Sequence, residues 1–300
     1  MVKLRMASSG NGILKLTLDG LNNASFDYGL LHKNKQIKNL SIMSDLDVIT
    51  SCEPKKAIQE LKLTFNEYNV ILVFVSQYDA HAWASFWISL ESNEYIQVDF
   101  LCDPLGTSKY GICTSEILKN SVDLLGCKFV DSDSFNCYYL IKKIIKKDYS
   151  AASNIYKSVG SELSLFIEKK YISDRGIFTV SKFDKKIILN AKSKLMVYAY
   201  ILKSQTIRIF LRPGIQLYVD NSYSINMVAS QLNSIVPRVR IYDGKLYSRF
   251  LAWLNKSRNE IQLFRSFSSE NKFDSRIEHK SINEIYKSLS KITESKVLHT

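Results

Sequence analysis

Three aspartates interrupt apolar, strand-like segments of this 300-residue chain. Asp45 and Asp47 lie two residues apart in IMSDLDVIT, and Asp99 lies in YIQVDFL. Because side chains alternate across a strand, Asp45 and Asp47 share one face, and Leu46 and Val48 point toward a core on the other. Two neighbouring carboxylates repel each other unless a cation or a basic side chain neutralises them. A bound divalent metal would remove that repulsion.

Asp99 would complete such a metal site. In the strand expected over 95–101 the apolar residues fall on one face and Asp99 on the other. If this strand lies beside the strand of Asp45 and Asp47, three carboxylates meet on one part of the sheet. Such hard oxygen ligands suit Mg²⁺ or Mn²⁺, and two such ions could stabilise the attacking and leaving oxygens in phosphoryl or nucleotidyl transfer. Alternatively, Asp45 caps a turn, Asp47 pairs with a lysine, and Asp99 closes its strand.

The surrounding pattern predicts an α/β (α+β) fold with a mixed sheet and helical cover on at least one side. A helix is expected from Ser51, with Pro54 in its first turn, to about Glu67. Strands are expected over 70–75, 83–90, 95–101, 206–211, 215–219 and 239–242, and the segment 13–18 fits a strand or a short helix. From Thr114 the periodicity is helical. The predicted domains are therefore 1–112, a helical appendage over 113–172, and a basic α/β domain over 173–300.

Charge divides the chain unevenly. Residues 1–150 carry 16 Lys and Arg against 17 Asp and Glu, whereas residues 151–300 carry 25 against 12. The second half is thus predicted to attract an anionic partner such as nucleic acid, a glycan, a phosphorylated substrate or a membrane surface; the alternative is a set of solvated lysines. The longest apolar run, 70–75, is too short to span a bilayer, and no signal peptide or CxxC pair is visible. A cytoplasmic location is expected.

The aspartate motifs carry a resemblance. SDLDV and YIQVDFL, with the helix and strands between them, resemble the polymerase-beta type of nucleotidyltransferase superfamily. More narrowly, the run from YGLLH through FWISL to YYLIKK is similar to nucleotidyltransferase-like proteins of bacterial surface-polysaccharide gene clusters. The resemblance covers roughly residues 25–160. It implies that Asp45, Asp47 and Asp99 are the catalytic, metal-binding residues, that Asp99 helps to activate an incoming hydroxyl, and that the substrate is a nucleoside triphosphate.

Four further residues are candidates for holding the nucleotide. Gly29 and Leu30 occupy the turn where the superfamily usually has Gly-Ser, so the serine that holds phosphate is missing here. His81 and Lys143 are candidate phosphate contacts. The alternatives are a hydrogen-bonded turn histidine and a solvated helix face, since lysine stems often cover apolar helix surface.

The second half resembles a degenerate kinase-like domain. The segment 211–227 looks like the first strand, loop and helix of such a domain. A working phosphate loop needs Lys-Ser or Lys-Thr where this chain has Ile225-Asn226. Kinase activity is therefore not expected.

Three functions follow as hypotheses. The first is a Mg²⁺-dependent transferase acting on a phosphorylated or hydroxyl acceptor in surface-polysaccharide biosynthesis. The second is a catalytically degenerate binding protein whose basic half docks on nucleic acid, a glycan or an enzyme. The third is a nucleotidyltransferase that modifies RNA or tRNA.

Overall fold

The computed structural model describes most of the first 159 residues and separate parts of the remainder. The described residues are 12–31, 45–79, 81–102, 114–124, 126–159, 179–180, 187–188, 195, 198–199, 202, 206, 214–219, 224–242, 260–265, 275–277 and 281–298. The predicted strand over 206–211 falls almost entirely outside them. None of the helices in these ranges is both long and apolar enough to cross a membrane.

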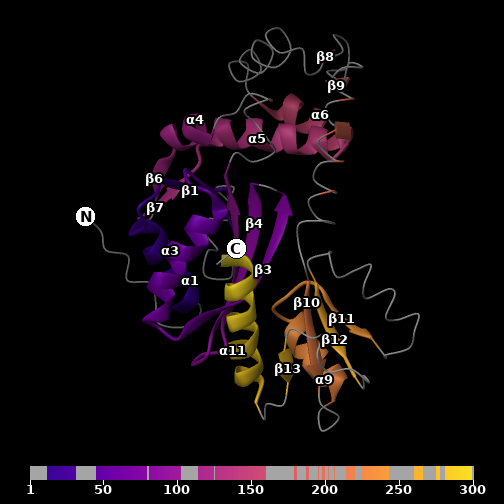
Figure 1. Ribbon diagram of the computed structural model, residues 1–300. Helices are drawn as coiled ribbons and strands as arrows, with labels where there is room; N and C mark the ends of the chain where they lie inside the picture. Colours follow the sequence, from indigo (N-terminus) through magenta and orange to yellow (C-terminus); the bar gives the residue numbers. More distant parts are fainter. Residues whose placement is uncertain are drawn as a thin grey trace.

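A seven-stranded mixed sheet organises the first half of the chain (Figure 1). Its strands, in spatial order, are β3 (Val70–Asp79), β4 (Ala82–Ser89), β5 (Tyr95–Leu101), β2 (Asp45–Thr50), β1 (Tyr28–Leu30), β7 (Cys127–Phe129) and β6 (Val122–Leu124). β5 pairs with β2 in parallel and with β4 antiparallel. The predicted mixed sheet is therefore confirmed.

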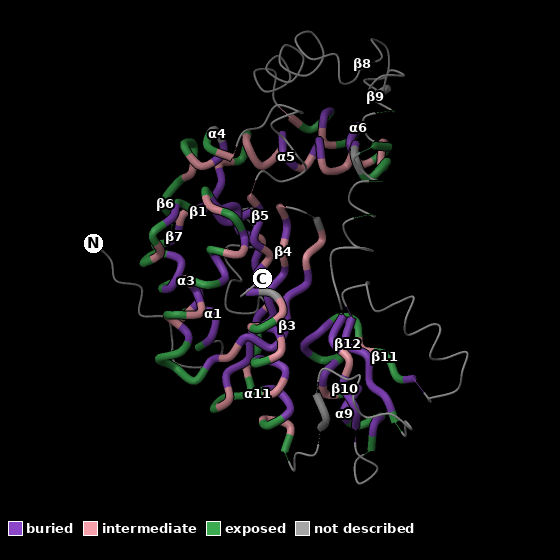
Figure 2. Tube along the Cα trace, in the orientation of Figure 1, coloured by how far each residue is buried: buried purple, intermediate pink, exposed green. Residues whose placement is uncertain are grey.

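Two helices cover one face of this sheet. They are α1 (Gly12–Asn22) and α3 (Pro54–Asn66), whose apolar positions recur at helical spacing. Their buried side chains pack on the inward residues of β2, β4 and β5, including Leu46, Val98 and Trp87. Pro54 opens α3, where its missing N–H costs nothing. Figure 2 shows how the buried residues follow the strands and the inner sides of these helices. The aspartates point to the opposite face.

A second, smaller sheet lies in the second half. Its order is β11 (Val239–Tyr242), β12 (Ile261–Phe264), β10 (Ile215–Val219) and β13 (Ser275–Ile277), with every pair parallel. Helix α9 (Ile225–Asn233) follows β10, with Ser224 as its N-cap. The predicted strands over 215–219 and 239–242 are confirmed. Apolar residues of this sheet, of α9, of β3 and β4 and of the C-terminal helix over 282–293 belong to one buried cluster, so the two sheets share a core.

The last helix closes the free edge of the large sheet. α11 (Ile282–Thr293) and its π-helical extension η5 (Glu294–Leu298) run beside the edge strand β3. The hydroxyl of Thr293 donates to the carbonyl of Val73, 2.9 Å away, where the β3–β4 register shifts. Lys62 of α3 pairs with Glu294 at 2.8 Å. An edge strand covered in this way cannot pair with another chain.

Two local expectations are settled or corrected. The segment 13–18, which fitted either a strand or a helix, belongs to α1. The helical periodicity from Thr114 is wrong beyond α4 (Thr114–Lys119), because β6 and β7 form a hairpin that extends the large sheet. Gly126 in its turn has φ +76°, a conformation that favours glycine. The rest of the middle segment is helical, in α5 (Ser132–Ile145) and α6 (Tyr149–Ser158).

Replacing Thr293 by valine tests the role of α11 at this edge. The variant keeps the side-chain shape but leaves the Val73 carbonyl without its buried donor. We expect a loss of about 1–3 kcal/mol in the free energy of unfolding, measured by urea denaturation. Thr293→Ser keeps the hydroxyl and serves as the control. A larger destabilisation by Thr293→Ser than by Thr293→Val would show that the methyl group, rather than the hydrogen bond, matters.

Candidate active site

Parallel pairing of β2 with β5 brings the three predicted metal ligands together. Asp47 is in register with Asp99, and Asp45 is in register with Gln97. Paired residues on neighbouring strands point to the same face, and the strands lie about 4.8 Å apart. Asp45 is exposed, and Asp47 and Asp99 are half-buried. The predicted convergence of these residues on one face of the sheet is confirmed.

The surroundings of Asp99 disfavour the charged form of its carboxyl group. Burial, followed by the charges of Asp47 and Asp45, raises the pKa of Asp99 to about 7. Two groups act in the opposite direction. Gln97 donates a hydrogen bond of 2.7 Å from Nε2 to Oδ1 of Asp99, and Lys142 contributes a positive charge. Alternation alone puts Gln97 on this face, but its bond to Asp99 emerges only from the side-chain geometry.

The donor set fits a hard divalent cation in chemistry and in strand register. Three carboxylates lie on one face, and burial and then repulsion raise the pKa of one of them, so a cation would stabilise their charged forms. Within the described ranges, however, no three His, Cys, Asp or Glu side chains form a ready-made metal cluster. A bound ion would therefore have to draw the carboxylates toward itself.

Helix α5 lies across the carboxyl ends of β2 and β5. Its lysines differ in their surroundings. Lys143, the predicted nucleotide contact, forms an ion pair with Asp148 at 2.9 Å, and its ammonium lies over the ring of Tyr139. Lys142 is the residue whose charge acts on Asp99. Lys143 is thus engaged by Asp148, whereas Lys142 is the lysine whose charge lowers the pKa of Asp99.

Gly29 and Leu30 lie next to the aspartates in the sheet, because β1 pairs with β2. Leu30 is fully buried in the core on the opposite face. Gly29 faces the aspartate side, but a Cβ at this position would lie 2.9 Å from Val130 and 3.0 Å from the hydroxyl oxygen of Ser121. These neighbours, rather than open space for a phosphate, occupy the surroundings of Gly29.

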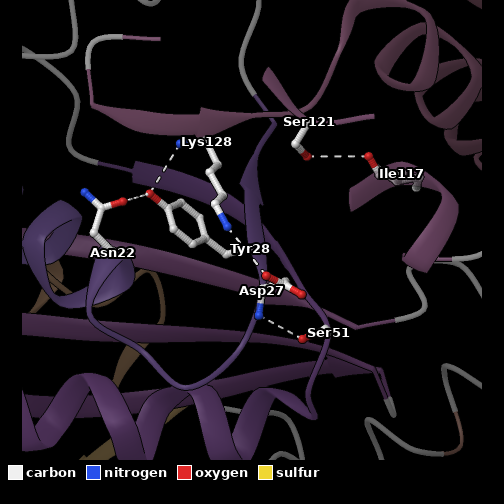
Figure 3. Close-up of polar contacts among 7 residues, drawn as sticks. All are labelled: Asn22, Asp27, Tyr28, Ser51, Ile117, Ser121 and Lys128. Carbon is white, nitrogen blue, oxygen red and sulfur yellow. Dashed lines mark hydrogen bonds and ion pairs between the residues drawn. The ribbon is translucent and has the colours of Figure 1, made fainter. Parts of the chain in front are cut away.

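Polar contacts of Asp27 and Tyr28, the two residues before Gly29, hold β1 in place (Figure 3). The Tyr28 hydroxyl donates to the Asn22 side chain and accepts from the Lys128 N–H. The Asp27 N–H donates to the Ser51 hydroxyl at 3.0 Å, just beyond β2. β1 is therefore tied to both of its neighbouring strands, which leaves little freedom to open the space around Gly29.

His81 lies in the β3–β4 hairpin, near the carboxyl end of β5. Its backbone carbonyl accepts a hydrogen bond of 2.8 Å from the N–H of Cys102. Asp99 lies three residues before Cys102 in the sequence, within β5. His81 therefore lies at the same end of the sheet as Asp99. A phosphate-binding role for His81 stays a prediction.

Asp99→Asn tests the charge at this position. The folded-state pKa of Asp99 is about 7, above the ordinary aspartate value of 3.8. The folded protein therefore binds more protons than the unfolded chain between these values, and stability is lost as pH rises through this window. We expect Asp99→Asn to stabilise the metal-free protein by on the order of 2 kcal/mol at pH 8 and to have little effect at pH 4. Asp123→Asn, at an exposed site, is the control in thermal denaturation; a pH-independent difference would contradict the assignment.

Gly29→Ala tests the close packing around β1. The added methyl group would press on Val130, Ser121 and Leu118, the last of which lies 3.3 Å from the Cβ position. We expect a destabilisation of about 1–3 kcal/mol in urea denaturation. Adding Ser121→Gly should recover part of it. No recovery in the double variant would indicate that Val130 and Leu118, rather than Ser121, set the limit.

Comparison with known proteins gives limited information about this chain. No family of known proteins and no curated protein matches it. Among solved structures, two from Helicobacter pylori are similar at 10% sequence identity and a TM-score of 0.31. One, provisionally described as a nucleotidyltransferase, is covered over 91% of its length, and the other, JHP933, over 88%; each match covers 65% of this chain. Similarity at this level does not place the chain in a family.

Proposed function

We propose that this chain is a Mg²⁺- or Mn²⁺-dependent nucleotidyltransferase that transfers a nucleotidyl group to a phosphorylated or hydroxyl acceptor. The observation that supports the proposal is the in-register pairing of Asp47 with Asp99, two residues beyond Asp45. It gathers three hard oxygen donors on the face of the sheet that α1 and α3 leave uncovered.

In this proposal Asp45, Asp47 and Asp99 hold the metal, which when bound supplies positive charge to the phosphoryl oxygens. Asp99 accepts the proton of the acceptor hydroxyl. The hydroxyl oxygen then bonds to the α-phosphorus of the nucleoside triphosphate, and the bond to the pyrophosphate leaving group breaks. Gln97 fixes the orientation of the Asp99 carboxylate by its hydrogen bond.

The biological setting of the proposal rests on the resemblance of the aspartate motifs. Surface-polysaccharide biosynthesis would supply a phosphorylated or glycan-linked acceptor. A cytoplasmic location would supply nucleoside triphosphates and Mg²⁺. Both remain parts of the proposal.

A second candidate is a catalytically degenerate binding protein. The crowded surroundings of Gly29 favour it, because they leave no room at that glycine for the phosphate. The basic half would then dock on an anionic partner, although Arg240, one of its arginines, is already paired with the buried Glu260 at 3.0 Å. Salt-dependent binding to heparin or RNA that survives substitution of the aspartates would support this candidate over the enzyme.

Metal binding separates the two candidates. Asp47→Asn removes a charge from the centre of the aspartate group, and we expect at least a tenfold loss of Mn²⁺ affinity in electron paramagnetic resonance titrations. Pyrophosphate release from a mixture of the four nucleoside triphosphates should be lost in parallel. Asp123→Asn provides the matched control on an exposed strand. Equal Mn²⁺ binding by the wild type and Asp47→Asn would refute the metal site.

A further inference from the structure

The packing of α5 on the large sheet determines which of its side chains lies near the aspartates. Ile49 and Leu101 form the next in-register pair on the same face, one step beyond Asp47 and Asp99 toward the carboxyl ends of the strands. Both belong to one buried cluster with Tyr138 and other residues of α5. The helix therefore packs at the carboxyl ends of β2 and β5, and Figure 1 shows it running across the ends of the strands of the large sheet.

Lys142 contacts Tyr138 of the same helix but forms no ion pair with Asp99. Its ammonium lies 5.4 Å from the centre of the Tyr138 ring, and Tyr138, one turn earlier, is buried. Its charge reaches Asp99, yet no ion pair within 4 Å joins the two residues in the described part of the chain. Lys143, the next residue, is by contrast engaged by Asp148.

A positive group set opposite a carboxylate-bound metal has a specific use. The carboxylates by themselves repel an anion, but a metal held by Asp45, Asp47 and Asp99 would supply positive charge to phosphate oxygens. A lysine on the far side of those oxygens completes a clamp on the same phosphate group, which is a recurrent arrangement in phosphoryl chemistry. Because the surroundings of Gly29 are filled, β1 offers no such clamp at that position.

We infer that Lys142 binds a phosphate group of the nucleotide, and that α5 rather than the β1 glycine provides the phosphate-binding side of the site. The inference rests on the proposed function and names the residue that recognises the polyphosphate part of the substrate. Tyr138 acts as its support, keeping the lysine stem extended over the aspartate face.

The test uses the full chain and five probes: the Mg²⁺ complexes of ATP, GTP, CTP, UTP and inorganic tripolyphosphate. Lys142→Gln keeps most of the side-chain stem and removes the charge. Isothermal titration calorimetry should show roughly a 10- to 100-fold weaker binding of tripolyphosphate and of whichever nucleotides the wild type binds. Mn²⁺ binding without phosphate should not weaken. Lys157→Gln, an exposed lysine on α6, controls for the change in net charge.

The outcomes distinguish the inference from the function on which it rests. Lys142→Gln within twofold of the wild type would overturn the inference alone, and so would an equal loss in Lys143→Gln. Failure of the wild type to bind any of the five probes would overturn both the inference and the nucleotide substrate. Thermal denaturation of each variant ensures that a loss of binding reflects the missing charge rather than unfolding.

Discussion

The pairing of β2 with β5 is the constraint on which the site depends. It places Asp47 against Asp99 at the spacing of neighbouring strands, so that two carboxylates share a half-buried face. Loss of hydration on burial, together with repulsion by Asp47 and Asp45, raises the pKa of Asp99. Gln97 and Lys142 offset only part of this cost. A positive charge placed on this face would therefore stabilise the carboxylates.

The remainder of the fold holds that pairing rigidly. On one side of the sheet, α1 and α3 bury the residues that alternate with the aspartates, which prevents a one-residue slip of either strand. At the edge, α11 covers β3 and links it to α3 through Lys62 and Glu294. At the carboxyl ends of the strands, α5 packs on Ile49 and Leu101. Packing on three sides therefore keeps the carboxylates side by side despite their repulsion.

The two sides of the proposed substrate site differ in what they can offer a phosphate. On the β1 side, Val130, Ser121 and Leu118 crowd Gly29, and Leu30 turns into the core. On the α5 side, Lys142 carries a charge over the aspartate face. The absence of a serine after Gly29 in β1 and the presence of Lys142 on α5 are thus complementary features of the proposed site.

The sequence by itself determined which face each aspartate takes, because alternation along a strand is a local property and the apolar neighbours declare the core side. It also determined α3 and the strands β2, β3, β4, β5, β10 and β11, whose apolar periodicity is local. Only the tertiary structure decided that β2 and β5 are neighbours, since strand pairing joins residues about 50 positions apart through hydrogen bonds that leave no local signal. The same reason applies to the β6–β7 hairpin, whose apolar residues also fit a helix and form strands because β7 pairs with β1. It applies as well to the distinction between Lys142 and Lys143. Two adjacent lysines look alike in the sequence, and the packing of α5 on the sheet decides which of them overhangs the aspartates.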